Sequence, residues 1–152
     1  MAGTGILVLG IGNRFRHDDG VGPVIAERLE ASGIATRVES GEGAELMEAW
    51  QGFPHVVLVD AASSGAAAGT LHRFEAAETR LPTGLFHYSS HLFSVAEAIE
   101  MARILGRLPG RMTVYGIEGR DFSYGEGLSV EVAAAADVAE AEIRALVAAG
   151  RG

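Results

Sequence analysis

The stretch His55–Asp60 constrains the fold more than any other part of this sequence, because its apolar residues are consecutive. Between His55 and Asp60 the chain runs Val-Val-Leu-Val, so four neighbouring side chains are apolar and three of them are β-branched. Such residues favour strands, and a strand without polar alternation is expected to be buried on both faces of its sheet. Sheets covered on both faces are typical of α/β proteins, in which helices alternate with mostly parallel strands.

Other segments supply the strands and helices that such a sheet needs. Further strands are predicted at Gly5–Leu9, Ala35–Glu39 and Met112–Ile117, with an edge strand at Thr70–Phe74. Apolar residues at helical spacing predict four helices: from just after Asp19 to Gly33, across Leu46 to Trp50, through Leu92 to Ala102, and over Ser129–Ala149 with Gly150 as its stop. We therefore expect a mostly parallel sheet between helices, in a single domain over residues 1–152.

Composition excludes several classes of function. The formal net charge is −8, lysine is absent and the arginines are scattered, so no basic stripe is available for a phosphate backbone. Cysteine is also absent, which excludes disulfides, thiolate metal sites and cysteine nucleophiles. Asn13 and Arg14 interrupt the first apolar run, and no apolar stretch reaches the roughly 18 residues of a membrane span. We expect a soluble, cytoplasmic protein that binds neither nucleic acid nor membranes.

Two carboxylates are predicted at the carboxyl edge of the sheet, where open α/β sheets bind their ligands. Asp19, the second acid of an Asp18-Asp19 pair, follows the first strand, whereas Asp60 ends the central strand. His91 lies at the mouth of a helix, where the helix dipole disfavours the protonated ring and keeps the imidazole available to a metal. Two carboxylates and one imidazole from three segments form a ligand set suited to a divalent metal.

The residues alone leave other roles open for these groups. Acids at a helix N-terminus also act as caps, and Asp60 could form an Asx turn with Ala62. His17 and His87 are alternatives to His91, because one lies beside the acidic pair and the other in the same loop. His55 and His72 lie on strands and are expected to be structural.

Two other kinds of site are less well supported by the sequence. The Gly10-Ile11-Gly12 turn resembles a dinucleotide-binding loop, but Phe15 stands where the third glycine is needed. The Asp18-Asp19 pair would also repel a phosphate at that helix mouth. Ser63-Ser64 lacks the G-x-S-x-G turn that exposes a hydrolase nucleophile.

Motifs along nearly the whole chain resemble those of one known protein family. The segment ILVLGIGNRFRHDDGVG is similar to its opening signature of a strand, G-x-G-N and an acidic pair before a helix. VVLVDA resembles the strand that delivers its second acid, and SSHLFSVAEAI resembles its third motif, a histidine that opens a helix. Gly41–Glu48 is similar to its glycine-rich second loop and helix, and YGIEGRDFSYGEGLSVEV to its last strand, turn and helix. The family that these motifs resemble is the hydrogenase maturation protease family.

The resemblance implies a three-layer α/β fold, in which a twisted five-stranded sheet lies between helices. It implies that Asp19, Asp60 and His91 are the catalytic and metal-binding residues, and that they engage nickel already inserted in the precursor of a nickel-iron hydrogenase large subunit. The enzyme would be an endopeptidase that removes the C-terminal extension of that precursor. Nickel would come from the substrate, and no organic cofactor is expected. We also expect Gly41, Glu42 and Asp18 to line the substrate cleft, and the protein to be a monomer.

Three alternative functions differ from this one in what the protein binds. A doubly wound nucleotide- or phosphate-binding module would be stabilised strongly by nucleotides. A general metallohydrolase would hold stoichiometric metal in its resting state. A maturation chaperone would bind the hydrogenase precursor without cutting it.

Overall fold

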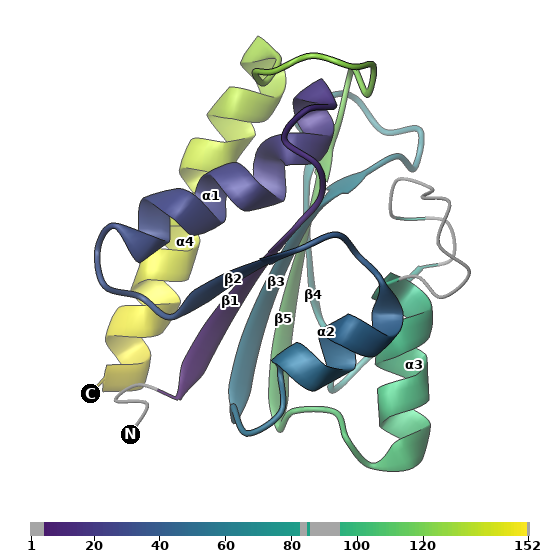
Figure 1. Ribbon diagram of the computed structural model, residues 1–152, viewed down its shortest axis with the longest axis vertical. Helices are drawn as coiled ribbons and strands as arrows, with labels where there is room; N and C mark the ends of the chain where they lie inside the picture. The colour runs from purple at the N-terminus through teal and green to yellow at the C-terminus, as the bar shows by residue number, and fades with distance from the viewer. Residues whose placement is uncertain (1–4, 83–84, 86–94, 152) are drawn as a thin grey trace.

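A five-stranded sheet forms the middle layer of the computed structural model, which describes residues 5–82, 85 and 95–151 (Figure 1). The strands are β1 (Ile6–Ile11), β2 (Thr36–Glu39), β3 (His55–Ala62), β4 (Leu71–Glu75) and β5 (Arg111–Glu118), in the order β2-β1-β3-β5-β4. The first four strands in that order are parallel, and β4 pairs antiparallel with β5 at one edge. The predicted mostly parallel five-stranded sheet is confirmed.

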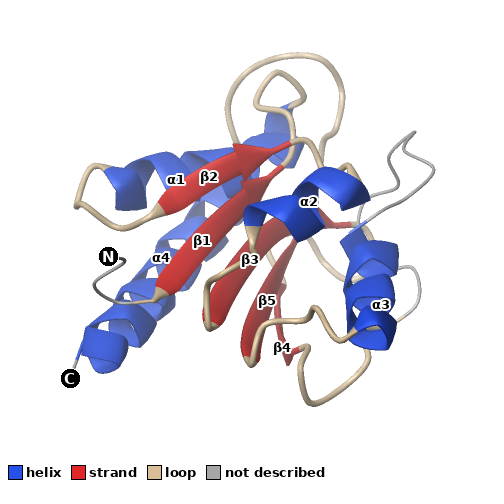
Figure 2. Ribbon diagram, turned by 60° about the horizontal axis from the view of Figure 1, so that its bottom comes forward, coloured by secondary structure: helices blue, strands red, loops and turns tan. Residues whose placement is uncertain are grey.

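Helices cover both faces of the sheet (Figure 2). α1 (Val21–Glu30) and α4 (Val130–Arg151) lie on one face, and α2 (Gly43–Ala49) and α3 (Val95–Leu105) lie on the other. Val57 belongs to the same core cluster as Ile143 of α4, whereas its neighbour Leu58 belongs to the cluster of Ile99 of α3. Successive residues of β3 thus enter opposite cores, which explains why this strand has no polar alternation.

Two glycines near helix ends have different roles. Gly33 adopts φ 82° after α1, and the amide of Ile34 donates to the carbonyl of Leu29 at 3.3 Å, so this glycine ends the helix as predicted. The prediction that Gly150 stops the last helix is wrong, because α4 continues to Arg151. A Cβ on Gly150 would lie only 2.9 Å from Cδ1 of Ile6, so the missing side chain allows α4 to pack closely on β1.

The third helix is described from Val95 onward, so its predicted beginning near Leu92 lies outside the described residues. It packs beside α2 on the face opposite α4. Within the described part of the chain, no helix is both long and apolar enough to cross a membrane.

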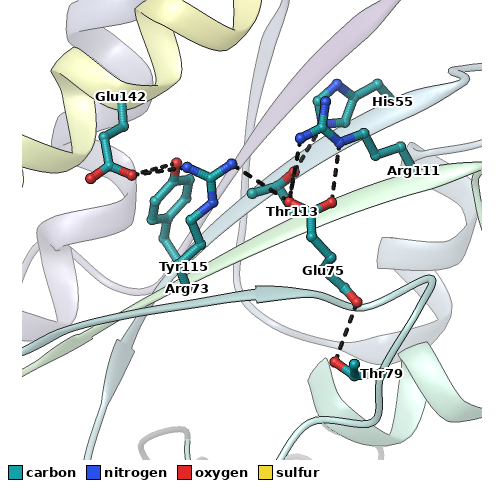
Figure 3. Close-up of polar contacts among 8 residues, drawn as sticks. All are labelled: His55, Arg73, Glu75, Thr79, Arg111, Thr113, Tyr115 and Glu142. Carbon is teal, nitrogen blue, oxygen red and sulfur yellow. Dashed lines mark hydrogen bonds and ion pairs between the residues drawn. The ribbon is translucent and has the colours of Figure 1, made fainter.

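A polar network holds the edge strand β4 to β5 near the amino end of β3 (Figure 3). The Glu75 carboxylate accepts hydrogen bonds from Thr113 at 3.0 Å and from Nε of Arg111 at 3.1 Å, and Oγ1 of Thr113 lies 3.0 Å from Nε2 of His55. Burial opposes ionisation of Glu75, but the hydrogen bonds from Arg111 and Thr113 outweigh it and lower the pKa of this carboxyl. Burial, assisted by the charge of Arg111, also lowers the pKa of His55.

Farther along the same strand, β4 is tied to the helix layer. Arg73 and the hydroxyl of Tyr115 both donate to Oε1 of Glu142 in α4, at 3.2 and 3.0 Å (Figure 3). The Arg73 guanidinium also lies 5.6 Å from the centre of the Tyr115 ring. These contacts place the charged groups of Arg73 and Glu142 beside the edge strand. Charged side chains at a sheet edge oppose pairing with a strand from another molecule.

Glu75→Gln is expected to destabilise the protein most at neutral pH. Because the pKa of Glu75 is lower in the folded than in the unfolded chain, its carboxylate contributes stability above the unfolded value of 4.5. That contribution is lost as the pH falls through the folded pKa. Thermal melts near pH 7 should show a loss of about 1–2 kcal/mol, and wild type and variant should converge in acid. Acid protonation of His55 weakens both proteins, and because the charge of Glu75 raises the pKa of His55, the comparison measures the carboxylate together with its effect on that ring. An equal difference in stability at every pH would contradict the prediction.

Candidate active site

Glycines allow α1 to approach the carboxyl ends of β1 and β3. A Cβ on Gly10 would lie 2.3 Å from the carbonyl oxygen of Gly22, and a Cβ on Gly22 would lie 2.5 Å from that of Val59. Gly12 has φ 138° and passes so close to Asp19 that a Cβ would lie 1.9 Å from the Asp19 carbonyl oxygen. The glycines of the G-x-G turn therefore face this chain's own backbone, and their close packing brings Asp19 to the edge of the sheet.

Asp19 lies on a 3₁₀ turn, η1 (His17–Gly20), between β1 and α1. One of its carboxylate oxygens, Oδ2, accepts a hydrogen bond from the backbone amide of Asn13 at 2.9 Å. The residue is partly buried, and its charge acts on the carboxyl group of Asp60. The structure thus brings together two carboxyl groups from separate segments, one after β1 and one on β3.

Asp60 does not end its strand, contrary to the prediction, because β3 continues through Ala62. Its Oδ1 accepts a hydrogen bond from the amide of the next residue, Ala61, at 2.8 Å, which is not the Asx turn with Ala62 considered from the sequence. Asp60 is only 6% exposed, and burial raises the pKa of its carboxyl well above the ordinary value. The negative charge of Asp19 raises this pKa further, and the Ala61 N–H partly opposes both effects.

A buried carboxyl group that is affected by the charge of a second one has two chemical uses. The two groups can share a proton, because ionising both places like charges together, or they can hold a cation that cancels those charges. Within the described residues, Asp19 and Asp60 have no third histidine, aspartate or glutamate close enough to form a metal-binding group of three. A metal held here therefore needs a further ligand from elsewhere.

Asp18 points away from this pair and is fully buried. Its carboxylate accepts hydrogen bonds from the backbone amides of Arg120 at 2.7 Å, Asp121 at 2.9 Å and Ser129 at 2.8 Å, and from the Ser129 hydroxyl at 2.9 Å. These donors lie in the segment between β5 and α4, which runs beside the loop after β1 (Figure 1). The expected place of Asp18 in the substrate cleft stays a prediction.

The second glycine-rich loop meets β1 and α3 at this edge. Glu42 caps α2, because its side chain accepts hydrogen bonds from the amides of Ala44 and Glu45 in the first turn of the helix. Gly41 has φ 101°, and a Cβ there would lie 3.3 Å from Cγ2 of Ile11 and 4.0 Å from Cγ2 of Val95. The expectation that Gly41 and Glu42 line a substrate cleft stays a prediction.

The histidines divide into those the structure describes and those it does not. His91 and the alternative ligand His87 both lie outside the described residues, so the choice between them stays a prediction. His17 has Nδ1 at 3.1 Å from a carbonyl oxygen of the segment before α4. His72 contacts a buried carboxylate at the end of β5, and His55 contacts a threonine of β5, so both have structural partners.

Two residues that had no predicted role hold the acids in place. The amide of Asn13 binds the Asp19 carboxylate, and Ser129 binds the Asp18 carboxylate twice. Both residues occur in segments that carry the family resemblance, ILVLGIGNRFRHDDGVG and YGIEGRDFSYGEGLSVEV, which is the signal that could have identified them. Asp18 and Ser129 are 111 positions apart, and no local spacing rule reveals a pair so distant in the chain.

Comparison with known proteins gives a consistent set of relatives. The family model HycI, described as hydrogenase maturation protease, matches residues 24–145. The hydrogenase expression/formation protein HupD of Rhodobacter capsulatus is 30% identical over 143 residues, which cover 90% of this chain and 68% of that protein. HupD of Rhizobium leguminosarum bv. viciae is 31% identical over 121 residues, and the match covers 76% of this chain and 60% of that protein.

Solved structures share the fold over nearly the full chain. The hydrogenase maturating endopeptidase HybD from Escherichia coli has a TM-score of 0.76 at 24% identity, covering 93% of this chain and 91% of that one. The [NiFe] hydrogenase maturation protease HybD from Thermococcus kodakarensis has a TM-score of 0.73 at 26% identity, covering 93% and 98%. The three-layer architecture described above is therefore the one seen in these endopeptidases.

Asp60→Asn is expected to stabilise the fold at alkaline pH. Because the pKa of Asp60 is higher in the folded than in the unfolded chain, stability is lost as the pH rises from the unfolded value of 3.8 through the folded pKa. Asparagine stays neutral and keeps an oxygen for the Ala61 amide. Melts near pH 8 should show a Tm gain of a few degrees, about 2–4 °C for each kcal/mol, that disappears towards pH 4.

The matched control is Asp137→Asn, which removes an exposed carboxylate of α4. It should show no gain that grows with pH. A Tm for D60N at or below that of the wild type near pH 8 would contradict the burial of a costly charge at this position.

Proposed function

The chain belongs to the hydrogenase maturation protease family and is an endopeptidase of that class, and we propose that it removes the C-terminal extension of a nickel-loaded [NiFe] hydrogenase large-subunit precursor. The observation that carries the proposal is the Asp19–Asp60 pair at the carboxyl edge of the sheet. Burial and the charge of Asp19 both oppose ionisation of Asp60, and a cation between the two carboxyl groups would offset that cost. The substrate's own nickel supplies that cation. We also propose that the protein acts in the cytoplasm as a monomer.

The third ligand in this proposal is His91. Val95, four positions after His91, lies beside Ile11 and Gly41 at the carboxyl edge, which supports a ligand from the segment that leads into α3. A neutral imidazole adds a nitrogen ligand without further negative charge, and nickel accepts both imidazole and carboxylate. The site then binds nickel only when a loaded precursor presents it. Its proposed ligands, Asp19, Asp60 and His91, include no thiolate that would hold a metal tightly in the free protein.

Cleavage follows from the same residues. Nickel draws charge from a water molecule or from the scissile carbonyl, and its positive charge favours the ionised form of Asp60 over the protonated form. Water attacks the carbonyl carbon, and a carboxylate oxygen not bound to nickel accepts the water proton. That proton passes to the leaving amine as the carbon–nitrogen bond breaks, so the products are an amine and a carboxylic acid, which then releases its proton to the solvent.

Asp60→Asn should abolish processing while leaving the fold intact. The amide is nearly isosteric with the carboxyl group, but it is a poor ligand for a dication and a poor base, so a loss of at least about 100-fold is expected. The assay is mass spectrometry of the nickel-loaded precursor after incubation with the protein. His91→Ala should lose as much activity, whereas His87→Ala should stay within a few-fold of wild type. An active D60N enzyme would remove Asp60 from the site.

Nickel-free precursor should remain uncut, even when zinc or magnesium is supplied to the protease. Cleavage of that precursor at a comparable rate would favour a general metallohydrolase, and binding of loaded precursor without cleavage would favour a chaperone. Strong thermal stabilisation by nucleotides would favour a phosphate-binding module. Serine- and cysteine-directed inhibitors should have no effect, because the proposed mechanism uses neither nucleophile.

A further inference from the structure

The Asp18 carboxylate joins two segments that are distant in the sequence. Its Oδ1 accepts from the amide of Ser129, and its Oδ2 accepts from the amides of Arg120 and Asp121 and from the Ser129 hydroxyl. The side chain is fully buried and both oxygens are engaged. The geometry is therefore that of a group that holds two parts of the chain together.

This link acts directly on the turn that carries Asp19. Asp18 and Asp19 are consecutive in η1, and successive side chains of a 3₁₀ helix point about 120° apart. One acid can therefore face the segment Arg120–Ser129 while the other faces Asp60. The backbone follows the same path, because the amide of Asp18 donates to the carbonyl of Asp121 at 2.9 Å.

We propose that Asp18 is a positioning residue, which holds Asp19 opposite Asp60 by tying η1 to the segment Arg120–Ser129. The role extends to Ser129, whose hydroxyl and amide supply two of the four hydrogen bonds. This inference rests on the proposed function, because the placement of Asp19 matters for rate only if the acidic pair acts on the precursor. It predicts an effect on kcat and not on KM, since both residues would act on the rate through the position of Asp19.

Three substitutions remove the hydrogen bonds between Asp18 and Ser129 to different extents. Ser129→Ala removes the hydroxyl bond and keeps the amide bond, and Ser129→Thr restores a hydroxyl. Asp18→Asn replaces one accepting oxygen by an NH₂ group that faces N–H or O–H donors, so at least one buried donor loses its partner. The matched control is Glu75→Gln, which also disrupts a hydrogen-bonded carboxylate. Glu75 lies at the end of β4, and its donors lie at the amino end of β5, away from the acidic pair.

The first readout reports the position of Asp19 without any substrate. The amide of Asn13 donates to Oδ2 of Asp19, so its proton chemical shift in an NMR spectrum reports that contact. Asp19→Ala gives the reference shift for a lost bond. D18N and S129A should move the Asn13 resonance towards that reference, whereas S129T and E75Q should leave it near the wild-type position.

The second readout is the kinetics of precursor cleavage, at a temperature where melts show every variant to be folded. A misplacement of the order of 1 Å can cost about 100-fold in rate, so we expect kcat to fall about 10- to 100-fold in D18N and about 3- to 10-fold in S129A. KM should stay within about twofold, and S129T should recover most of the wild-type kcat. E75Q should lower Tm and leave kcat unchanged.

The outcomes separate this inference from the proposed function. An unmoved Asn13 resonance with unchanged kcat, despite a lower Tm in D18N, overturns the positioning role. A moved resonance with unchanged kcat overturns it as well. A moved resonance in a protein whose wild type does not cleave nickel-loaded precursor supports the placement of Asp19 by Asp18 and refutes the proposed function instead.

Discussion

Burial of β3 on both faces determines where this protein can place reactive groups. Val57 and Leu58 enter opposite cores, so a polar side chain in the middle of the strand would lose its water on either side. After His55 the strand has a polar side chain only near its carboxyl end, at Asp60. Burial raises the pKa of this carboxyl group even there. The glycines that admit α1 add a second acid from the neighbouring loop, and the edge of the sheet becomes the candidate site.

Two carboxyl groups of the sheet respond to burial in opposite ways. Glu75 has Arg111 and Thr113 as donors, and the balance of these interactions favours its ionised form. Asp60 has one backbone donor and an acid as its charged neighbour, so the same loss of water favours its protonated form. The donors around Glu75 stabilise the fold. Among the described residues, the surroundings of Asp60 lack a positive charge, so a cation bound there would favour its ionised form. Such contrasts are characteristic of functional sites, where local stability is lower than the surrounding structure could provide.

The sequence predicted features that depend on local physics. The apolar run of β3 identified the central strand, and Gly33 identified the end of α1, because each rests on the properties of a few adjacent residues. Gly150 was misinterpreted because its role depends on Ile6, a contact across nearly the whole chain. The partners of Asp18 were missed for the same reason: a carboxylate at a helix mouth has the same local pattern whether it caps the helix, meets a ligand or binds a distant loop.

The hydrogen bonds of Asp18 also determine when the acidic pair can form during synthesis of the chain. β1, η1 and β3 are made early in synthesis, but the amides and hydroxyl that hold η1 belong to residues 120–129, just before the final helix. A ribosome-bound chain that has completed β3 already contains both acids of the pair, yet lacks the donors that fix one of them. Closing so long a loop is a late step, with a large entropic cost. The growing chain would therefore remain without a formed acidic pair until residues 120–129 emerge, and a product truncated before them would not carry a competent site.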